Sequence, residues 1–169
     1  MKIIEALKML KDLQRKAEDL RGKVKQHSAH MNFETPVYPD QKGQVAAWIQ
    51  SHSDLLKEIL NLRVSIQKTN INTSVTIELS KKQVTKSIAE WIHRRRDLAN
   101  FERDMWKQLT DRNLKEGTGM NSMQQPIEVK IVRCYNPSER DERIMALESE
   151  PSQVDAKLEI VNATTDLIE

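Results

Sequence analysis

Apolar residues recur at alternating steps of three and four through most of this chain. This spacing is typical of a helix that buries one stripe of side chains. Four such runs predict helices, and Pro151 inside the last run predicts a break, because proline interrupts the backbone hydrogen bonds of a helix. The expected helices cover residues 2–27, 43–70, 80–116, 137–149 and 151–163.

Two short segments alternate apolar and polar residues instead, which is typical of strands. They cover residues 74–79 and 127–134, and we expect them to pair with each other. Ser80 to Gln83 has the Ser-x-x-Gln pattern of a capping box and predicts the start of the third helix. Asn136 and Pro137 supply an N-cap and a first-turn proline for the next helix.

The sequence therefore predicts a mainly α protein with a single domain over residues 1–169. The expected architecture is an elongated antiparallel helical bundle or coiled coil with a small two-stranded β-hairpin. The apolar stripes of four helices exceed what one thin hairpin of helices buries. We therefore expect the chain to form a homo-oligomer.

Composition agrees with long helices and argues against an α/β enzyme. Charged residues make up 31% of the 169 residues, and only 4 residues are glycine, too few for the turns and phosphate loops of a nucleotide-binding α/β fold. Neither a Gly-x-Ser-x-Gly elbow nor an HExxH pair occurs. His27 and His30 stand three residues apart, but no further ligand is spaced to complete a metal site. We expect no catalysis, no metal and no cofactor.

Charge is distributed unevenly along the chain although the net charge is only +2. Residues 137–169 carry 3 Lys or Arg against 9 Asp or Glu, whereas residues 80–116 carry 10 against 6. We expect the acidic last segment to lie along basic helices. Because acidic residues interrupt the basic ones, a nucleic-acid duplex is not an expected partner. No apolar run is long enough to cross a bilayer, and Cys134 has no partner for a disulfide within the chain, so we expect a soluble cytoplasmic protein without a membrane partner.

Polar residues interrupt the predicted apolar stripes and give candidates for a ligand site. Such residues either fix the helix register and face solvent, or line a polar pocket for an anion. The densest basic cluster lies one turn after a tryptophan, and a guanidinium beside an indole suits a phosphate joined to a nucleobase. The alternative for this cluster is a solvated face paired with nearby acidic residues. The candidate ligand-binding residues are His52, Trp91, Arg94, Arg95, Arg96 and Glu102.

The chain resembles the septicolysin-like family, which consists of small bacterial helical proteins of unknown function. The resemblance lies in short segments that keep the same order along nearly the whole chain. The segments are Glu5-Ala6-Leu7, Asp12-Leu13-Gln14, Ile66-Gln67-Lys68-Thr69-Asn70 with Thr73, Arg96-Asp97-Leu98 and Asn162-Ala163-Thr164-Thr165-Asp166-Leu167. The chain departs from the family pattern over residues 28–43 and 117–136. The resemblance implies a long helical hairpin assembly with a small two-stranded element, and it supplies no catalytic residues. The family name implies a cytolysin, which needs a longer membrane-inserting segment than the expected hairpin offers.

These observations predict a non-enzymatic, homo-oligomeric helical binding protein. The expected ligand is small, anionic and nucleotide-like, and the expected site is a groove lined by arginine and tryptophan. Two alternatives stay open: a protein–protein interaction scaffold without a ligand site, and a membrane-active, cytolysin-like protein.

Overall fold

The computed structural model describes residues 1–168 of the chain, and helices make up 62% of it. The chain folds into two compact units that each take segments from distant parts of the sequence. The first unit contains residues 1–75, 87–89 and the segment from 158 onward, and the second contains residues 76–86 and 90–157. The mainly helical class is confirmed, whereas the bundle or coiled-coil architecture and the single domain stay predictions.

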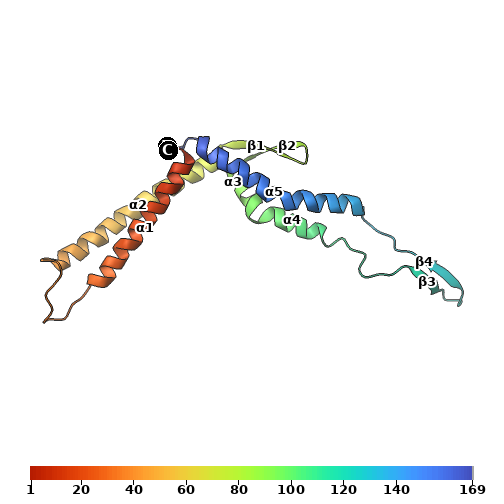
Figure 1. Ribbon diagram of the computed structural model, residues 1–169, viewed down its shortest axis with the longest axis horizontal. Coiled ribbons are helices and arrows are strands. Elements are labelled where there is room, and N and C mark those ends of the chain that lie inside the picture. Colours follow the sequence, from red (N-terminus) through yellow and green to blue (C-terminus); the bar gives the residue numbers. More distant parts are fainter. Residues whose placement is uncertain (169) are drawn as a thin grey trace. The chain divides into compact units, whose positions relative to one another are not determined.

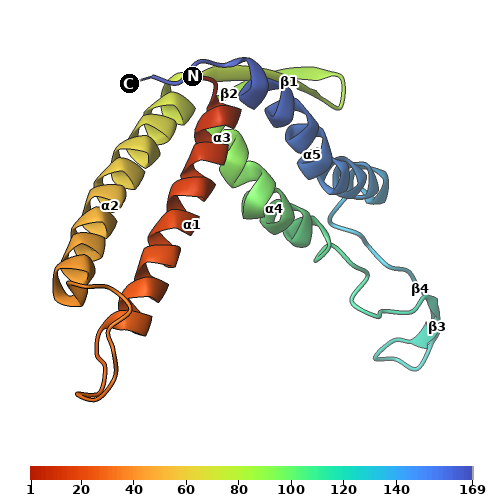
Figure 2. The same ribbon diagram turned by 60° about the vertical axis from the view of Figure 1, so that its left-hand side comes forward.

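Two long helices, α1 (Ile3–His27) and α2 (Gln41–Asn72), lie side by side in the first unit (Figures 1 and 2). The predicted apolar stripes are buried or half-buried at every residue, so both are confirmed. They consist of Ile3, Ala6, Leu10, Leu13, Ala17, Leu20 and Val24 on α1, and Val45, Trp48, His52, Leu55, Ile59, Leu62, Ile66 and Thr69 on α2. Leu13, Ala17 and Ile59 form a buried cluster between the helices. The partly buried residues that pack against this cluster are Leu10, Leu55 and Leu62.

The two ends of the chain meet in the first unit. Ile3 donates its backbone N–H to the carbonyl of Thr165 at 3.1 Å, and Leu167 donates to the carbonyl of Met1 at 2.8 Å. The side chains of Lys2 and Asp166 form an ion pair at 2.9 Å. These contacts fix the start of α1 against the residues that follow the last helix.

The third predicted helix is shorter than expected and contains a π-helical turn. It consists of α3 (Ile88–His93), the π-helical turn η1 (Arg94–Leu98) and α4 (Ala99–Trp106). A π-helical turn adds one residue to a helix and shifts every later residue around its axis. Consequently Ala99 is fully buried, whereas Leu98, which continues the three-and-four spacing of Val84, Ile88, Trp91 and Arg95, is 46% exposed. The predicted helix over residues 80–116 is therefore wrong at both ends and in its buried face.

Residues 80–87 form a turn and a strand instead of a helix. Strand β1 (Ser74–Leu79) pairs with β2 (Lys82–Ser87), and Ser80 and Lys81 between them both have positive φ, at 50° and 64°. Two consecutive positive φ values are typical of the tight turns of β-hairpins. The capping-box prediction at Ser80 is wrong, because residues 82–87 pair with β1 as a strand and the helix begins only at Ile88.

The second strand pair lies between α4 and the last helix. Strand β3 (Gly117–Met120) pairs antiparallel with β4 (Pro126–Val129). The observed strand β4 is thus shorter than the predicted strand over residues 127–134, and it starts one residue earlier. It pairs with β3, which the sequence did not predict as a strand, and not with residues 74–79, so the predicted pairing is wrong.

The last helix, α5 (Pro137–Thr164), is continuous through Pro151. The predicted break is wrong because α5 is held on both sides of the proline: Glu150 pairs with Arg94 and Asp155 pairs with Arg95. The predicted N-cap is confirmed, since the Asn136 side chain accepts the backbone N–H of Ser138 at 2.9 Å. Among residues 1–168, no helix is both long enough and apolar enough to span a membrane.

Candidate functional site

A cluster of three charged residues in the second unit joins η1 and α4 to α5. The Arg94 guanidinium donates from Nε and Nη2 to the two carboxylate oxygens of Glu150, at 2.5 and 3.0 Å. Nη2 also contacts Glu102 Oε2 at 2.5 Å. Glu150 is 5% exposed, and its hydrogen bonds to Arg94 raise the pKa of the guanidinium above its usual range. Arg94 therefore stays protonated at physiological pH.

The cluster lies in a groove that we call the hairpin groove. The β1–β2 hairpin supplies Leu79 and Val84 to its wall, and α5 supplies Leu147. One part of the groove has a volume of about 460 Å³, and an adjoining part has about 530 Å³. The two parts share the Arg94 cluster and the wall formed by the hairpin. The groove thus combines apolar walls with a buried ionic group, which is the usual composition of a small-ligand site.

Charges of both signs line the hairpin groove. Lys82 and Arg143 are the basic residues of the first part besides Arg94, and neither forms an ion pair within residues 1–168. The Arg143 guanidinium lies 5.8 Å from the centre of the Trp106 ring. Glu139 and Glu142 add acidic groups, so the groove is not uniformly positive.

The structure distributes the predicted ligand-binding residues over several environments. Trp91 lies at the wall of the groove but is fully buried. Its indole therefore has no exposed surface on which a nucleobase could stack. Arg95 pairs with Asp155, and Arg96 pairs with Asp97 and contacts His93 at 3.0 Å. Only Arg94 and Glu102 of the six present charged groups to the groove.

His52 belongs to the first unit, where it lies half-buried on α2. It is on the apolar stripe that the sequence predicts, and α2 packs against α1 along this stripe. The hairpin groove is lined by residues of the second unit, and His52 is not one of them. The observed groove therefore does not include His52.

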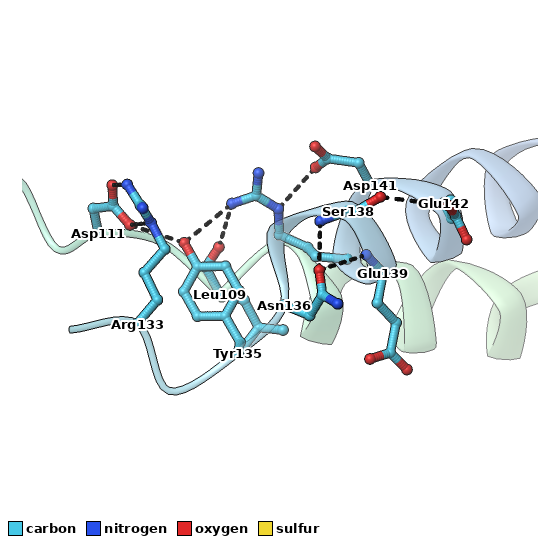
Figure 3. Close-up of polar contacts among 10 residues, drawn as sticks. Leu109, Asp111, Arg133, Tyr135, Asn136, Ser138, Glu139, Asp141 and Glu142 are labelled. Carbon is cyan, nitrogen blue, oxygen red and sulfur yellow. Dashed lines mark hydrogen bonds and ion pairs between the residues drawn. The ribbon is translucent and has the colours of Figure 1, made fainter. Parts of the chain in front are cut away.

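A second polar cluster holds together the two ends of the segment between α4 and α5. We call residues 107–136 the arm and this cluster the arm clamp. Arg133 donates to both oxygens of Asp111, at 2.7 and 2.6 Å, and the Tyr135 hydroxyl donates to the same carboxylate at 3.0 Å (Figure 3). The hydrogen bonds from Arg133 hold the pKa of Asp111 below its usual range.

Arg140 from the first turns of α5 completes the arm clamp. It donates from Nη1 to the backbone carbonyl of Leu109 at 2.9 Å and contacts the Tyr135 hydroxyl at 3.3 Å. Its guanidinium also lies 5.4 Å from the centre of the Tyr135 ring. The clamp thus connects α5 to the chain just after α4 and closes the base of the arm.

The sequence predicts Glu102 as a site residue, but it does not identify Glu150 or any residue of the arm clamp. Glu150 was included only in the general expectation that the acidic last segment faces basic helices. That expectation is confirmed by the pairs Arg94–Glu150, Arg95–Asp155 and Lys107–Glu148. Asp111 and Arg133 stand 22 residues apart, and no periodic pattern connects them.

The fold and these clusters define a helical protein of two units with a groove and an arm. The chain belongs to a family of unknown function, described as "Family of unknown function (DUF6847)", which matches residues 10–167. The expected membership of a family of unknown function is confirmed, whereas the resemblance to the septicolysin-like family stays a prediction. No curated protein matches the chain.

One solved structure is similar to the whole chain. It is the crystal structure of a functionally unknown conserved protein from Corynebacterium diphtheriae, with a TM-score of 0.58 and 20% sequence identity. The similarity covers 99% of both chains. It supports the fold and carries no information about activity.

Proposed function

We propose that the protein acts as a homo-oligomer, a self-associating helical protein without catalytic activity. Its accessible surface area is the observation that carries the proposal. The chain of 19.6 kDa exposes 12608 Å². A compact monomer of this mass exposes about 8,600 Å², and two separate compact domains of half the mass expose about 10,300 Å² in total.

This excess surface is large enough for a stable interface. It amounts to roughly 2,300 Å² even against two separate domains. A stable protein–protein interface of ordinary size buries about 800 Å² on each partner. Association of two or more copies therefore accounts for the surface that the single chain leaves exposed.

An exposed apolar stripe on α2 is the surface we assign to this association. Its residues are Ile49, Leu56, Leu60, Val64 and Ile71, and all five are exposed. At 3.6 residues per turn they fall within about 80° of the helix circumference, roughly 130° away from the side that packs against α1. Ser53 and Gln67 are polar residues within the same arc, but five large exposed aliphatic side chains on the outer side of one helix are typical of an interaction surface.

The test is the mass of the protein in solution, by sedimentation equilibrium over a range of concentrations. Wild-type protein is expected to reach a multiple of 19.6 kDa. Leu60→Glu places a charge on the α2 stripe and is expected to weaken association at least 100-fold. Asn61→Glu, an equivalent change on an exposed position beside the stripe, is the matched control. A wild-type mass of one chain at every concentration overturns the proposal.

A small anionic ligand in the hairpin groove is a second candidate function. Two basic residues without ion pairs within the described chain, Lys82 and Arg143, support it. The proposal differs from the expectation of an Arg94–Trp91 site, because Arg94 is neutralised by two carboxylates and Trp91 is buried. Here Lys82 and Arg143 bind the anionic group, and the apolar wall contacts the rest of the ligand.

Thermal unfolding in the presence of AMP, ATP or inorganic phosphate tests this second candidate. A rise in melting temperature is expected for at least one nucleotide, and it is lost in the double variant Lys82→Ala/Arg143→Ala. Lys115→Ala, which removes an exposed lysine outside the groove, is the control and should keep the rise. No rise for wild-type protein with any probe contradicts an anion site in the groove.

A further inference from the structure

The outer part of the arm is an exposed hairpin with very little charge. Residues 117–129 contain one charged residue, Glu128, in a chain of which 31% is charged. Several of its large apolar residues are exposed: Met120, Met123, Ile127 and Val129. Methionine is enriched in interfaces and charged residues are depleted at their centres, so this composition indicates a contact surface and not a solvated loop.

Neither face of this two-stranded sheet is covered by its own chain. Gly117 pairs with Val129, and Gly119 pairs with Ile127, so both aliphatic residues lie on one face beside glycines without side chains. A Cβ atom on Gly119 would lie 2.8 Å from a methyl carbon of Val129, which therefore occupies the space that the glycine leaves. All four residues of β4 are exposed. An isolated two-stranded sheet is only marginally stable, and this one lacks a layer to pack against.

The hairpin is nevertheless ordered at both ends by hydrogen bonds. At its tip the Asn121 side chain accepts the backbone N–H groups of Met123 and Gln125, both at 2.9 Å. At its base the arm clamp joins Asp111 to Arg133. Figures 1 and 2 both show β3 and β4 beyond the ends of α4 and α5. A surface that is ordered before binding loses little conformational entropy when a partner covers it.

We propose that the hairpin of residues 117–129 packs against a second copy of this chain. The inference rests on the proposed self-association and names the part of the second unit that takes part in it. A second copy is the occupant because the chain exposes roughly 2,300 Å² more than two compact domains of its mass, which exceeds the area of about 800 Å² that each partner of a stable interface buries. A nucleic acid is not suitable, because it requires basic residues and the hairpin has none.

A charge placed at the tip tests the proposal without disturbing the fold. Met123 is 78% exposed, so Met123→Glu is not expected to unfold the hairpin. We expect this variant to weaken self-association 10-fold to 100-fold in sedimentation equilibrium. Ser152→Glu, which adds the same charge on the exposed surface of α5, is the matched control and should associate as wild type does.

An environment-sensitive dye at the tip gives an independent measurement. The dye is attached to Met123→Cys in a Cys134→Ser background, and unlabelled wild-type protein is added. A blue shift that follows the concentration of added protein supports the contact, and a dye on Ser152→Cys should not shift.

The outcomes separate this inference from the proposed function. If wild-type protein associates but neither Met123→Glu nor the dye responds, the arm contact is overturned and self-association stands. If wild-type protein stays a single chain at every concentration, both are overturned. A dye shift that needs another macromolecule and not a second copy also overturns the arm contact.

Discussion

The two units of this protein bring helices together by different means. In the first, α1 and α2 meet along apolar side chains, and the buried cluster of Leu13, Ala17 and Ile59 contains no polar atom outside the backbone. In the second, α5 also buries Leu147 and Val154, but its contact with η1 includes the ionic cluster of Arg94, Glu102 and the buried carboxylate of Glu150. An apolar contact tolerates small shifts, whereas an ionic contact needs fixed positions for both partners.

This difference determines what each contact contributes. Apolar burial stabilises roughly in proportion to the area removed from water. In a buried ion pair the attraction between the charges offsets the cost of removing them from water and adds little further stability. Loss of one partner is strongly destabilising, because it leaves the other charge buried and unpaired. The first unit therefore depends on apolar packing, whereas the second depends both on its buried apolar residues, such as Trp91 and Val154, and on keeping its buried charges matched.

The largest expected effect is in the apolar contact of the first unit. Ile59→Ala removes buried side-chain volume between α1 and α2 and is expected to lower the free energy of unfolding by about 3 kcal/mol. Urea denaturation measures this loss. Asn61→Ala, on an exposed position of the same helix, is the control and should change it by less than about 0.5 kcal/mol. Equal effects of the two changes would contradict an apolar contact at Ile59.

The next largest effect is expected at the ionic contact of the second unit. Glu150→Gln leaves the Arg94 charge with Glu102 alone and is expected to cost about 2 kcal/mol, less than for a fully buried pair because Arg94 is partly exposed. The double variant Arg94→Met/Glu150→Leu removes both charges and should recover most of this loss. Urea denaturation of both variants measures the difference. If the double variant were less stable than Glu150→Gln, the ion pair itself would stabilise the fold, and the loss in Glu150→Gln would not come from an unpaired charge alone.

The same difference explains which parts of the fold the sequence predicts. The stripes of α1 and α2 follow from periodicity alone, because apolar packing repeats with the turns of a helix. The strand over residues 74–79 and the N-cap at Asn136 also follow from local patterns. In each case the structure depends on neighbours in the sequence.

The second unit is poorly predicted because its determinants are not periodic. The π-helical turn at Arg94–Leu98 changes the buried face of the helix within one turn, and no residue pattern predicts such a turn. The turn at Ser80 and Lys81 lacks the glycine or asparagine that usually marks a turn with positive φ. Of the two acidic partners of Arg94, Glu102 was among the predicted site residues, whereas Glu150 was not, because it lies 56 residues further along the chain.

The arm clamp allows a test of an ionic contact outside the core. The hydrogen bonds from Arg133 lower the pKa of Asp111, so the folded state binds its proton less tightly than the unfolded chain does. The stabilisation is therefore complete above the unfolded-state pKa of about 3.9 and is lost as the pH falls below it. Arg133→Gln is expected to move the pKa of Asp111 back toward its usual range in a carboxyl ¹³C NMR titration. Lys130→Gln, whose lysine pairs with Glu128, should leave it unchanged. An Asp111 that titrates alike in all three proteins would contradict the clamp.

The smallest effects are expected at exposed ion pairs, whichever unit contains them. Glu18 in the first unit pairs with Arg21, and Glu148 in the second pairs with Lys107, with both carboxylate side chains about half exposed or more. Glu18→Gln and Glu148→Gln should each change the free energy of unfolding by less than about 0.5 kcal/mol, because water screens these charges in both states. Comparison of Glu148→Gln with Glu150→Gln, two residues apart on α5, isolates burial as the cause of the larger loss. If Glu148→Gln were as destabilising as Glu150→Gln, the second unit would depend on its total charge pairing and not on one buried carboxylate.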